Sequence, residues 1–170
     1  MGDSSDCNAG LEQETFLNLV RSHDCLAGDQ NRFFQSFGIT AQQFNVLRVL
    51  FGCPDNRGFA CQAIAEKLLN RVPDITRLLD RLEQAELIQR FRCSTDRRVV
   101  RTQLTPQGRA KVEQVEAPLR ETLHKRFAHM TRHELGELNR LLIKVRDAAC
   151  PDSVAAPNAD SPCPGDAEGG

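Results

Sequence analysis

The sequence predicts a mainly α-helical protein with one small β-hairpin. Three observations support this fold class. Apolar residues recur at helical spacing along most of the chain, and the alternation typical of strands is confined to residues 87–104. Capping boxes and N-cap residues precede several of the helical stretches. The length of 170 residues allows one domain with a substantial core, flanked by tails.

The first helical stretch covers residues 11–35 and carries an irregular apolar stripe. Gly38 interrupts it. Thr40 and Gln43 then form a capping box that opens a second helix. Residues 52–58 hold two glycines, a proline and an asparagine, which predicts a loop.

Two shorter helices and a hairpin follow this loop. The first helix is expected over residues 61–69, and Pro73 is expected in the first turn of the second, which runs to about Ala85. Residues 87–92 and 99–104 have strand character and are joined by a polar turn, so we expect a hairpin.

The last part of the chain is helical again. Thr105 is expected to cap a long helix that has Pro106 in its first turn and ends near Met130. Thr131 and Glu134 form a second capping box, and a regular leucine stripe follows it.

The charge of the chain is unevenly distributed. Residues 1–10 and 149–170 are polar and poor in large apolar side chains, so we expect disordered ends, the second of them acidic. The formal net charge is −1, yet residues 32–146 hold 21 of the 22 basic and 12 of the 23 acidic residues, an excess of nine positive charges. A basic domain of this kind indicates a polyanionic partner.

Several classes of protein are disfavoured by the sequence. No apolar run approaches the roughly 20 residues needed to span a bilayer, and the first ten residues do not resemble a signal peptide, so we expect a cytoplasmic protein with no membrane partner. The seven cysteines show no CxxC spacing, which argues against a disulfide framework. No glycine-rich phosphate loop, Ser/His/Asp signature or HExxH motif is present, so we expect neither an enzyme nor a cofactor.

Helix, turn, helix and basic hairpin together form the layout of a winged helix-turn-helix. The major groove of DNA admits one helix, whose first turns can reach base edges. An arginine on a flanking hairpin can enter the narrow minor groove. The candidate DNA contacts on the helix are Arg71, Asp74, Thr76 and Arg77. The hairpin carries five arginines, Arg90, Arg92, Arg97, Arg98 and Arg101.

Residues 11–148 resemble the MarR family of bacterial transcription regulators. The motifs that carry the resemblance are Ile39–Arg48, Ile64–Leu68, Val72–Glu83, Asp96–Arg98 and Leu104–Gly108. The resemblance implies a homodimer built by residues 11–38 and 105–148, with a winged helix-turn-helix domain over residues 39–104 that binds a palindromic operator in double-stranded DNA.

The resemblance also implies roles for single residues. Asp96 orients the wing and Arg98 reaches the minor groove, with Arg97 beside them. The implied activity is that of a repressor released by a small-molecule ligand. The chain departs from the family pattern at Cys93 and Thr95, where an Asp and an Arg are common. It also has Glu86 where glycine is usual; in a left-handed conformation Glu costs about 1 kcal/mol or more relative to Gly.

Alternatives to these assignments stay open. Asp74 can serve as a favourable charge at a helix N-terminus or as an acceptor for a cytosine amino group. Cys93 lies among arginines, a setting that favours a reactive thiolate, and Cys25 lies on the first helix, so a redox-sensing regulator of the same fold is an alternative to inert thiols. A protein-interaction module without DNA binding is a further alternative, although such a module would not need the arginine-rich hairpin.

Ligand sites are weakly marked in the sequence. A small aromatic effector would lie in a pocket lined by Phe16, Phe33, Phe34, Phe37 and Phe44, although each is equally a core residue. Of the four histidines, His129 and His133 are four residues apart, but a helix break is expected between them, so no metal site is predicted.

Overall fold

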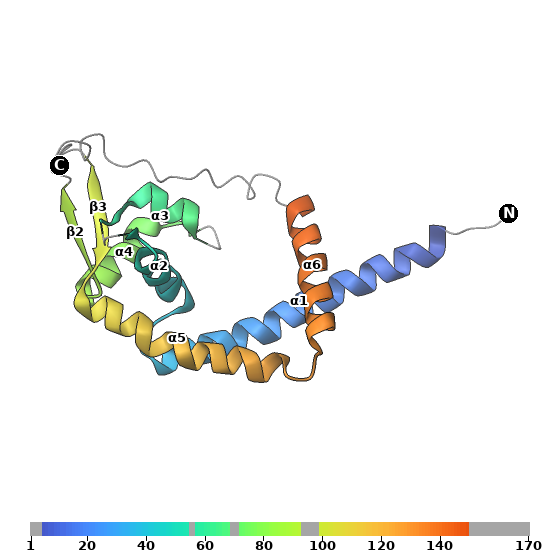
Figure 1. Ribbon diagram of the computed structural model, residues 1–170. Coiled ribbons are helices and arrows are strands. Elements are labelled where there is room, and N and C mark those ends of the chain that lie inside the picture. Colours follow the sequence, from blue (N-terminus) through green and yellow to red (C-terminus); the bar gives the residue numbers. More distant parts are fainter. Residues whose placement is uncertain (1–4, 55–56, 69–71, 93–98, 150–170) are drawn as a thin grey trace, which may run out of the picture. The chain divides into compact units, whose positions relative to one another are not determined.

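The computed structural model describes residues 5–54, 57–68, 72–92 and 99–149 (Figure 1). The chain divides into two compact units, residues 1–41 and 42–170. Within the described part of the chain, no helix is both long enough and apolar enough to cross a membrane.

The first unit consists mainly of one long helix, α1 (Ser5–Ser36). It begins six residues before the expected start at residue 11, so residues 5–10 are helical where the sequence predicted a disordered end. The physical reason is that extending a formed helix by one residue costs little, because each added residue gains a hydrogen bond without a new nucleation step. Polar composition alone therefore misplaces this boundary.

The second unit holds the remaining elements, and those that the sequence predicted follow the expected order. They are α2 (Ala41–Phe51), β1 (Phe59–Ala60), α3 (Cys61–Lys67), α4 (Ile75–Gln84), β2 (Ile88–Arg92), β3 (Val100–Leu104), α5 (Pro106–Phe127) and α6 (Arg132–Ala149). In Figure 1, α2, α3 and α4 lie on one side of the β2–β3 hairpin, and α5 leads away from its base. The predicted class, mainly α with a small β-hairpin, is confirmed.

The sheet has three antiparallel strands in the order β1-β3-β2. In the β2–β3 pair Ile88 lies opposite Leu104 and Arg92 opposite Val100. The short strand β1 pairs with β3 through Phe59 and Thr102. The sequence did not predict β1, because two residues are too few to show an alternating pattern.

The core of the second unit lies between its helices and the sheet. Buried side chains come from every element except β1 and α6, including Phe44, Leu47, Leu50, Ile64, Leu78, Leu79, Leu82, Ile88, Leu104, Val112 and Val115. None of the described residues of α6 is buried. The predicted leucine stripe of α6 is therefore present but faces outward in a single chain.

Three helix boundaries differ from the prediction. Pro73 precedes the N-cap residue Asp74 and does not lie in the first turn of α4, because the Asp74 carboxylate accepts the Arg77 backbone N–H at 2.9 Å and so sets the helix start. Helix α3 ends at Lys67. Helix α5 ends at Phe127, before the predicted Met130, since the following residues form the turn that leads into the next capping box.

Candidate nucleic-acid interface

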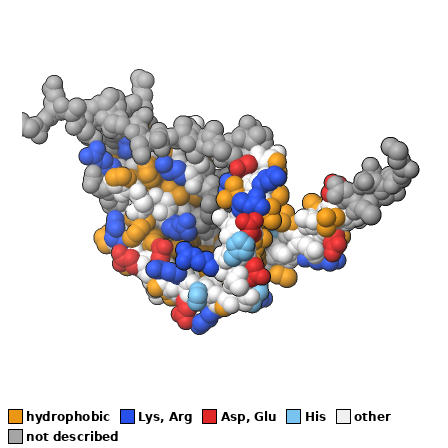
Figure 2. All heavy atoms as spheres, turned by 45° about the vertical axis from the view of Figure 1, so that its right-hand side comes forward, with side chains coloured by type: hydrophobic (Ala, Val, Ile, Leu, Met, Phe, Trp, Pro, Cys, Tyr) orange, Lys and Arg blue, Asp and Glu red, His pale blue; other side chains and the backbone are white. Residues whose placement is uncertain are grey.

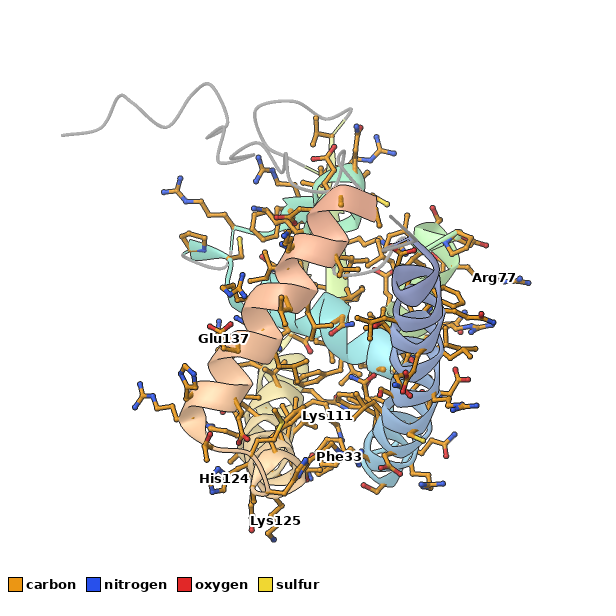
Figure 3. The ribbon with its side chains drawn as sticks, turned by 90° about the vertical axis from the view of Figure 1, so that its right-hand side faces the viewer. Phe33, Arg77, Lys111, His124, Lys125 and Glu137 are labelled. Atoms are coloured by element: carbon orange, nitrogen blue, oxygen red, sulfur yellow. The ribbon has the colours of Figure 1, made fainter. Side chains whose placement is uncertain are left out.

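Helix α4 presents two different faces. Its inner face is anchored by Leu78, Leu79 and Leu82, which are at most 7% exposed. Thr76 and Arg77 lie in its first turn and are exposed, and Figure 3 shows the Arg77 side chain extending outward. A helix held by one face and offering polar side chains at its N-terminal end has the geometry required to enter a major groove.

Asp74 serves as the N-cap of α4. Its carboxylate oxygen accepts the backbone N–H of Arg77, which satisfies one of the orphan donors of the first turn. Of the two roles left open by the sequence, helix capping is therefore seen directly. A contact between Asp74 and a base stays a prediction.

Two of the five hairpin arginines bind groups within the protein itself. Arg101 on β3 donates from Nη1 to the Gly58 carbonyl oxygen at 3.0 Å. Arg90 on β2 is 25% exposed and forms an ion pair with Asp80 of α4. Arg92, at the end of β2, is exposed. The sequence grouped all five as one basic surface, because it could not show which side chains turn toward the protein.

The remaining candidates for DNA contact lie outside the described residues. They are Arg71, which follows α3, and Asp96, Arg97 and Arg98, which lie between β2 and β3. Their DNA contacts stay predictions. Cys93 also lies outside the described residues.

A close junction joins α4, the hairpin and α5. Glu86 follows α4 with a φ of 58°, so the left-handed conformation considered from the sequence is present. The Thr105 hydroxyl donates to the Glu86 carbonyl at 2.6 Å, and the Thr105 backbone N–H donates to the Leu87 carbonyl at 3.2 Å. A Cβ placed on Gly108 would lie 1.9 Å from the Leu87 carbonyl oxygen, so only glycine permits this approach of α5 to the hairpin.

The five phenylalanines of the predicted effector pocket fall into separate groups, and the pocket they were expected to line stays a prediction. Phe33 contacts Phe34 and Phe37, with ring centroids 5.2 and 5.1 Å apart. Phe16 lies on the same continuous helix 17 residues earlier, about 25 Å along its axis, and is 65% exposed. Phe44 is buried in α2 of the second unit. The spacing along α1 therefore separates Phe16 from the Phe33 cluster.

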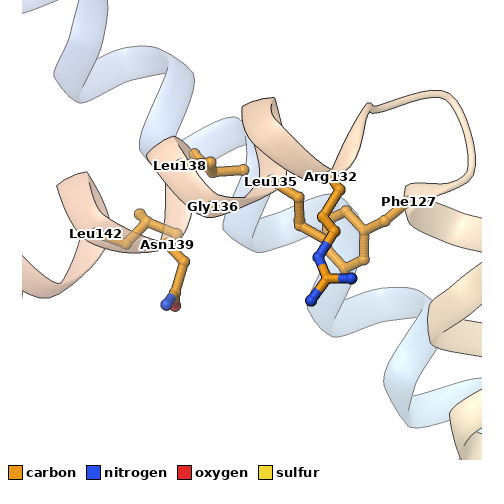
Figure 4. Close-up of a pocket in the computed structure, with 7 residues that line it drawn as sticks. All are labelled: Phe127, Arg132, Leu135, Gly136, Leu138, Asn139 and Leu142. Carbon is orange, nitrogen blue, oxygen red and sulfur yellow. The ribbon is translucent and has the colours of Figure 1, made fainter.

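A pocket of about 560 Å³ lies at the turn between α5 and α6 (Figure 4). Its lining consists of Phe127, three leucines of α6, Gly136, Arg132 and Asn139, and Figure 4 shows the Arg132 and Asn139 side chains pointing to the same side of α6. The sequence missed this pocket, because the leucine stripe of α6 predicted only an apolar helix face and not a hollow beside it.

The histidines and cysteines of the described residues form no evident site. The Thr131–Glu134 capping box separates His129 from His133, as predicted, and the described residues contain no cluster of three or more His, Cys, Asp or Glu side chains able to hold a metal ion. Cys25 is exposed on α1.

The capping box also shifts the pKa of its carboxyl group. Two hydrogen bonds lower the pKa of the Glu134 carboxyl below its ordinary value, the larger effect coming from the Thr131 backbone N–H and the smaller from the Thr131 hydroxyl. The box thus holds the start of α6 and with it one wall of the pocket.

Comparison with known proteins identifies the family. A sequence model described as the MarR family matches residues 39–100. A MarR transcription factor from Planctomyces limnophilus, known from its crystal structure, has 37% sequence identity to this chain. The alignment covers 76% of this chain and 93% of that chain, with a TM-score of 0.60. The chain belongs to the MarR family.

Curated relatives agree with this assignment. The transcriptional repressor MdtR of Bacillus subtilis is 30% identical over 112 residues, or 66% of this chain and 70% of MdtR. The regulator MhqR of the same organism is 33% identical, but the match spans only 62% of its length, less than two thirds. Both relatives are named as transcriptional regulators, so the expected class, a transcription regulator, is confirmed at the level of the family.

Proposed function

We propose that the chain is a cytoplasmic, homodimeric repressor that binds a palindromic operator and is released by a small-molecule ligand. The observation that carries this proposal is the exposed first turn of α4, with Thr76 and Arg77, on a helix whose opposite face is buried beside a hairpin. The excess of nine positive charges in residues 32–146 supports a DNA partner. MdtR is named a repressor, and a MepR–DNA complex of Staphylococcus aureus has the same fold at 24% identity and a TM-score of 0.68.

The homodimer is supported by the apolar surface of the helices that lie outside the core. Figure 2 shows apolar side chains reaching the surface on one face of the molecule. On α6, Leu135, Leu138, Leu141, Leu142, Ile143 and Val145 are 36–50% exposed, and α1 exposes Leu11, Phe16, Leu17, Leu19, Val20 and Leu26. Contiguous apolar surface on soluble proteins marks interaction sites. A second copy would cover these faces.

The dimer is tested by light scattering coupled to size exclusion. Replacing Leu138 and Leu141 by Glu places charges on the α6 stripe, and we expect the mass to fall from two chains to one. Gln62→Ala, which removes an exposed hydrogen bond with Glu66 on α3, outside the proposed dimerisation region, serves as the control and keeps the mass of the dimer. A monomeric wild-type protein would contradict the proposal.

DNA binding is tested by selecting binding sites from random duplexes. We expect a palindrome whose half-site centres lie about 10 base pairs apart, because dimeric helix-turn-helix proteins place their recognition helices about 34–36 Å apart. Affinity should fall steeply with salt, since arginine–phosphate contacts release counterions. A salt-independent affinity would contradict the proposal.

Single substitutions separate contacts that read the DNA sequence from contacts that only add affinity. Arg77→Ala is expected to relax the sequence preference, and Arg98→Ala to weaken binding by about 1–3 kcal/mol. Lys125→Ala, which removes an exposed ion pair with Glu121 on α5, supplies the matched loss of one positive charge outside α4 and the hairpin and is expected to leave the operator affinity unchanged.

The proposed ligand that releases the protein from DNA is a small aromatic compound. The organohalide-sensing regulator RdhR, whose fold is similar at 19% identity, has been solved in a form bound to 2,4-dichlorophenol. We therefore propose phenolic compounds as the first class to screen, with loss of the protein–operator complex as the readout. No release by any phenol would reject this ligand class.

Redox release is a second candidate, favoured by the exposed thiol of Cys25. Operator affinity is measured before and after mild peroxide in the wild type, Cys25→Ser and Cys93→Ser. Loss of affinity that either serine variant prevents would support a thiol switch. An unchanged affinity in the wild type would end this alternative.

A further inference from the structure

A cluster of charged side chains joins α4 to the strand that leads into the hairpin turn. Arg90 lies on β2, two residues before the end of that strand, and its guanidinium faces α4. Its partners on α4 are the Thr76 carbonyl and the carboxylates of Asp80 and Glu83. These positions are spaced four and three residues apart, so they lie on one face of the helix.

The Arg90 side chain contacts two successive turns of α4. Nη2 donates to Asp80 Oδ1 at 2.6 Å and lies 3.4 Å from the Thr76 carbonyl oxygen. Thr76 precedes Arg77, the exposed side chain proposed to contact a base. The guanidinium thus reaches the first turn of the helix from the strand, across 14 residues of sequence.

Glu83 binds the same arginine at its backbone. Its Oε1 accepts the Arg90 backbone N–H at 3.1 Å, and its Oε2 lies 3.6 Å from Nε. That Nε is buried and has no hydrogen-bond partner within the described part of the chain, so its contact with Glu83 is an ion pair without a hydrogen bond. One carboxylate therefore ties both the main chain and the side chain of Arg90 to α4.

The apolar contacts of α4 cannot by themselves fix the orientation of the helix relative to the hairpin. Leu78, Leu79 and Leu82 anchor the helix to the core, but apolar burial is non-directional and permits small rotations and shifts of the helix. Charge-assisted hydrogen bonds are directional, and the fixed fork of a guanidinium defines the relative position of the groups it joins. The Arg90 side chain is three-quarters buried, which limits screening by solvent.

We propose that Arg90 is a positioning residue that sets the orientation of α4 relative to the hairpin and thereby determines sequence preference. This inference rests on the proposed DNA binding. Arg90 acts through Asp80 and Glu83 and not through a phosphate. Its loss should therefore lower the ratio of specific to non-specific affinity, whereas the loss of a phosphate contact lowers both affinities together.

The test measures affinity for the selected operator and for a random-sequence duplex at one salt concentration. For Arg90→Lys, which keeps the charge but not the fork, and for Asp80→Asn, we expect operator affinity to fall about tenfold, as for the loss of one charge-assisted contact, with random-duplex affinity within about twofold. If only net charge mattered, Asp80→Asn would bind both duplexes more tightly and Arg90→Lys would behave as wild type. That result would overturn the proposal.

A coupling measurement and a control complete the test. The double variant Asp80→Asn/Arg90→Lys should be no worse than either single variant, because both remove the same interaction. Arg140→Lys, which alters the exposed ion pair with Glu137 on α6, controls for a change of arginine elsewhere. Thermal melts verify that each variant is folded at the assay temperature, and the near-isosteric Asp80→Asn tests the proposal even if Arg90→Lys is unstable.

The outcomes separate this inference from the proposed function. If the wild-type protein selects no DNA sequence, the proposed function fails. If the wild type selects an operator and Arg90→Lys and Asp80→Asn retain the full preference, the function stands and the positioning role of Arg90 is overturned.

Discussion

Glu86→Gly is expected to stabilise the protein. Glu86 has a φ of 58°, and the backbone around it forms a Schellman motif: its N–H donates to the Glu83 carbonyl at 2.9 Å, and the Leu87 N–H donates to the Leu82 carbonyl at 3.0 Å. The Glu86 side chain is exposed. The substitution therefore relieves backbone strain at a position where the side chain is not packed in the core.

The magnitude follows from two opposing effects. A non-glycine residue in the left-handed region costs about 1–2 kcal/mol. Glycine adds conformational entropy to the unfolded chain, which offsets about 0.4–1 kcal/mol of that gain. The midpoints of these two ranges differ by about 0.8 kcal/mol, which for a chain of this size corresponds to a rise in Tm of about 2–3 °C.

The end of α1 provides a matched control within the same chain. There the N–H of Gly38 donates to the Gln35 carbonyl at 2.9 Å and the Ile39 N–H donates to the Phe34 carbonyl at 3.2 Å, so Gly38, with a φ of 73°, occupies the position equivalent to Glu86. A Cβ on Gly38 would meet nothing within 4 Å. Gly38→Ala should therefore lower the Tm by a similar amount through backbone strain alone.

Differential scanning calorimetry of Glu86→Gly, Glu86→Ala and Gly38→Ala decides the question. Alanine keeps the strain at residue 86, so its Tm should stay near the wild-type value. An unchanged or lower Tm for Glu86→Gly would refute the reasoning. A rise of equal size for Glu86→Ala would assign the effect to the removed carboxylate and not to the backbone.

Three further substitutions test the packing and capping seen in the structure. Gly108→Ala should destabilise the protein by about 3 kcal/mol or more in chemical denaturation, because its Cβ would overlap the Leu87 carbonyl; a loss below about 1 kcal/mol would contradict the close approach. Asp74→Ala should cost about 1 kcal/mol in the same assay through loss of the α4 N-cap, and no loss would show that the cap is dispensable. The Tm difference between wild type and Glu134→Ala should shrink as the pH falls through the lowered pKa of Glu134. A carboxylate with a depressed folded-state pKa stabilises the fold above its ordinary pKa of 4.5 and loses that effect when it is protonated. A Tm difference independent of pH would exclude the Thr131 hydrogen bonds as its source.

The capping boxes and turn residues are the features that local sequence predicts well. Thr131 and Glu134 make the predicted reciprocal hydrogen bonds, and Thr105 caps α5 by accepting the Gly108 N–H at 3.0 Å. These interactions involve residues within one turn of each other, so their spacing in sequence is also their spacing in space. The left-handed conformation at Glu86 is different, because it was considered from the glycine that is usual at this position in the MarR family and not from a local pattern of this chain.

The candidate site was predicted only in part. The sequence placed Thr76 and Arg77 at the start of α4, and the structure leaves both exposed. It could not tell that Arg90 and Arg101 of the hairpin turn inward, because their partners, Asp80 and the Gly58 carbonyl, are 10 and 43 residues away. The sequence around a charged residue on a strand is the same whether its side chain faces solvent or contacts a helix.

What the sequence determined by itself is the order of the elements, their capping and the helix-turn-helix with its basic hairpin, because helical and strand periods and N-caps are local properties of the chain. What only the tertiary structure decided is how side chains are shared between elements. It shows β1 paired with β3, α5 brought against Leu87 at Gly108, and Arg90 held between two carboxylates of α4. These contacts depend on the distances between elements after folding, and no pattern within one element records such distances.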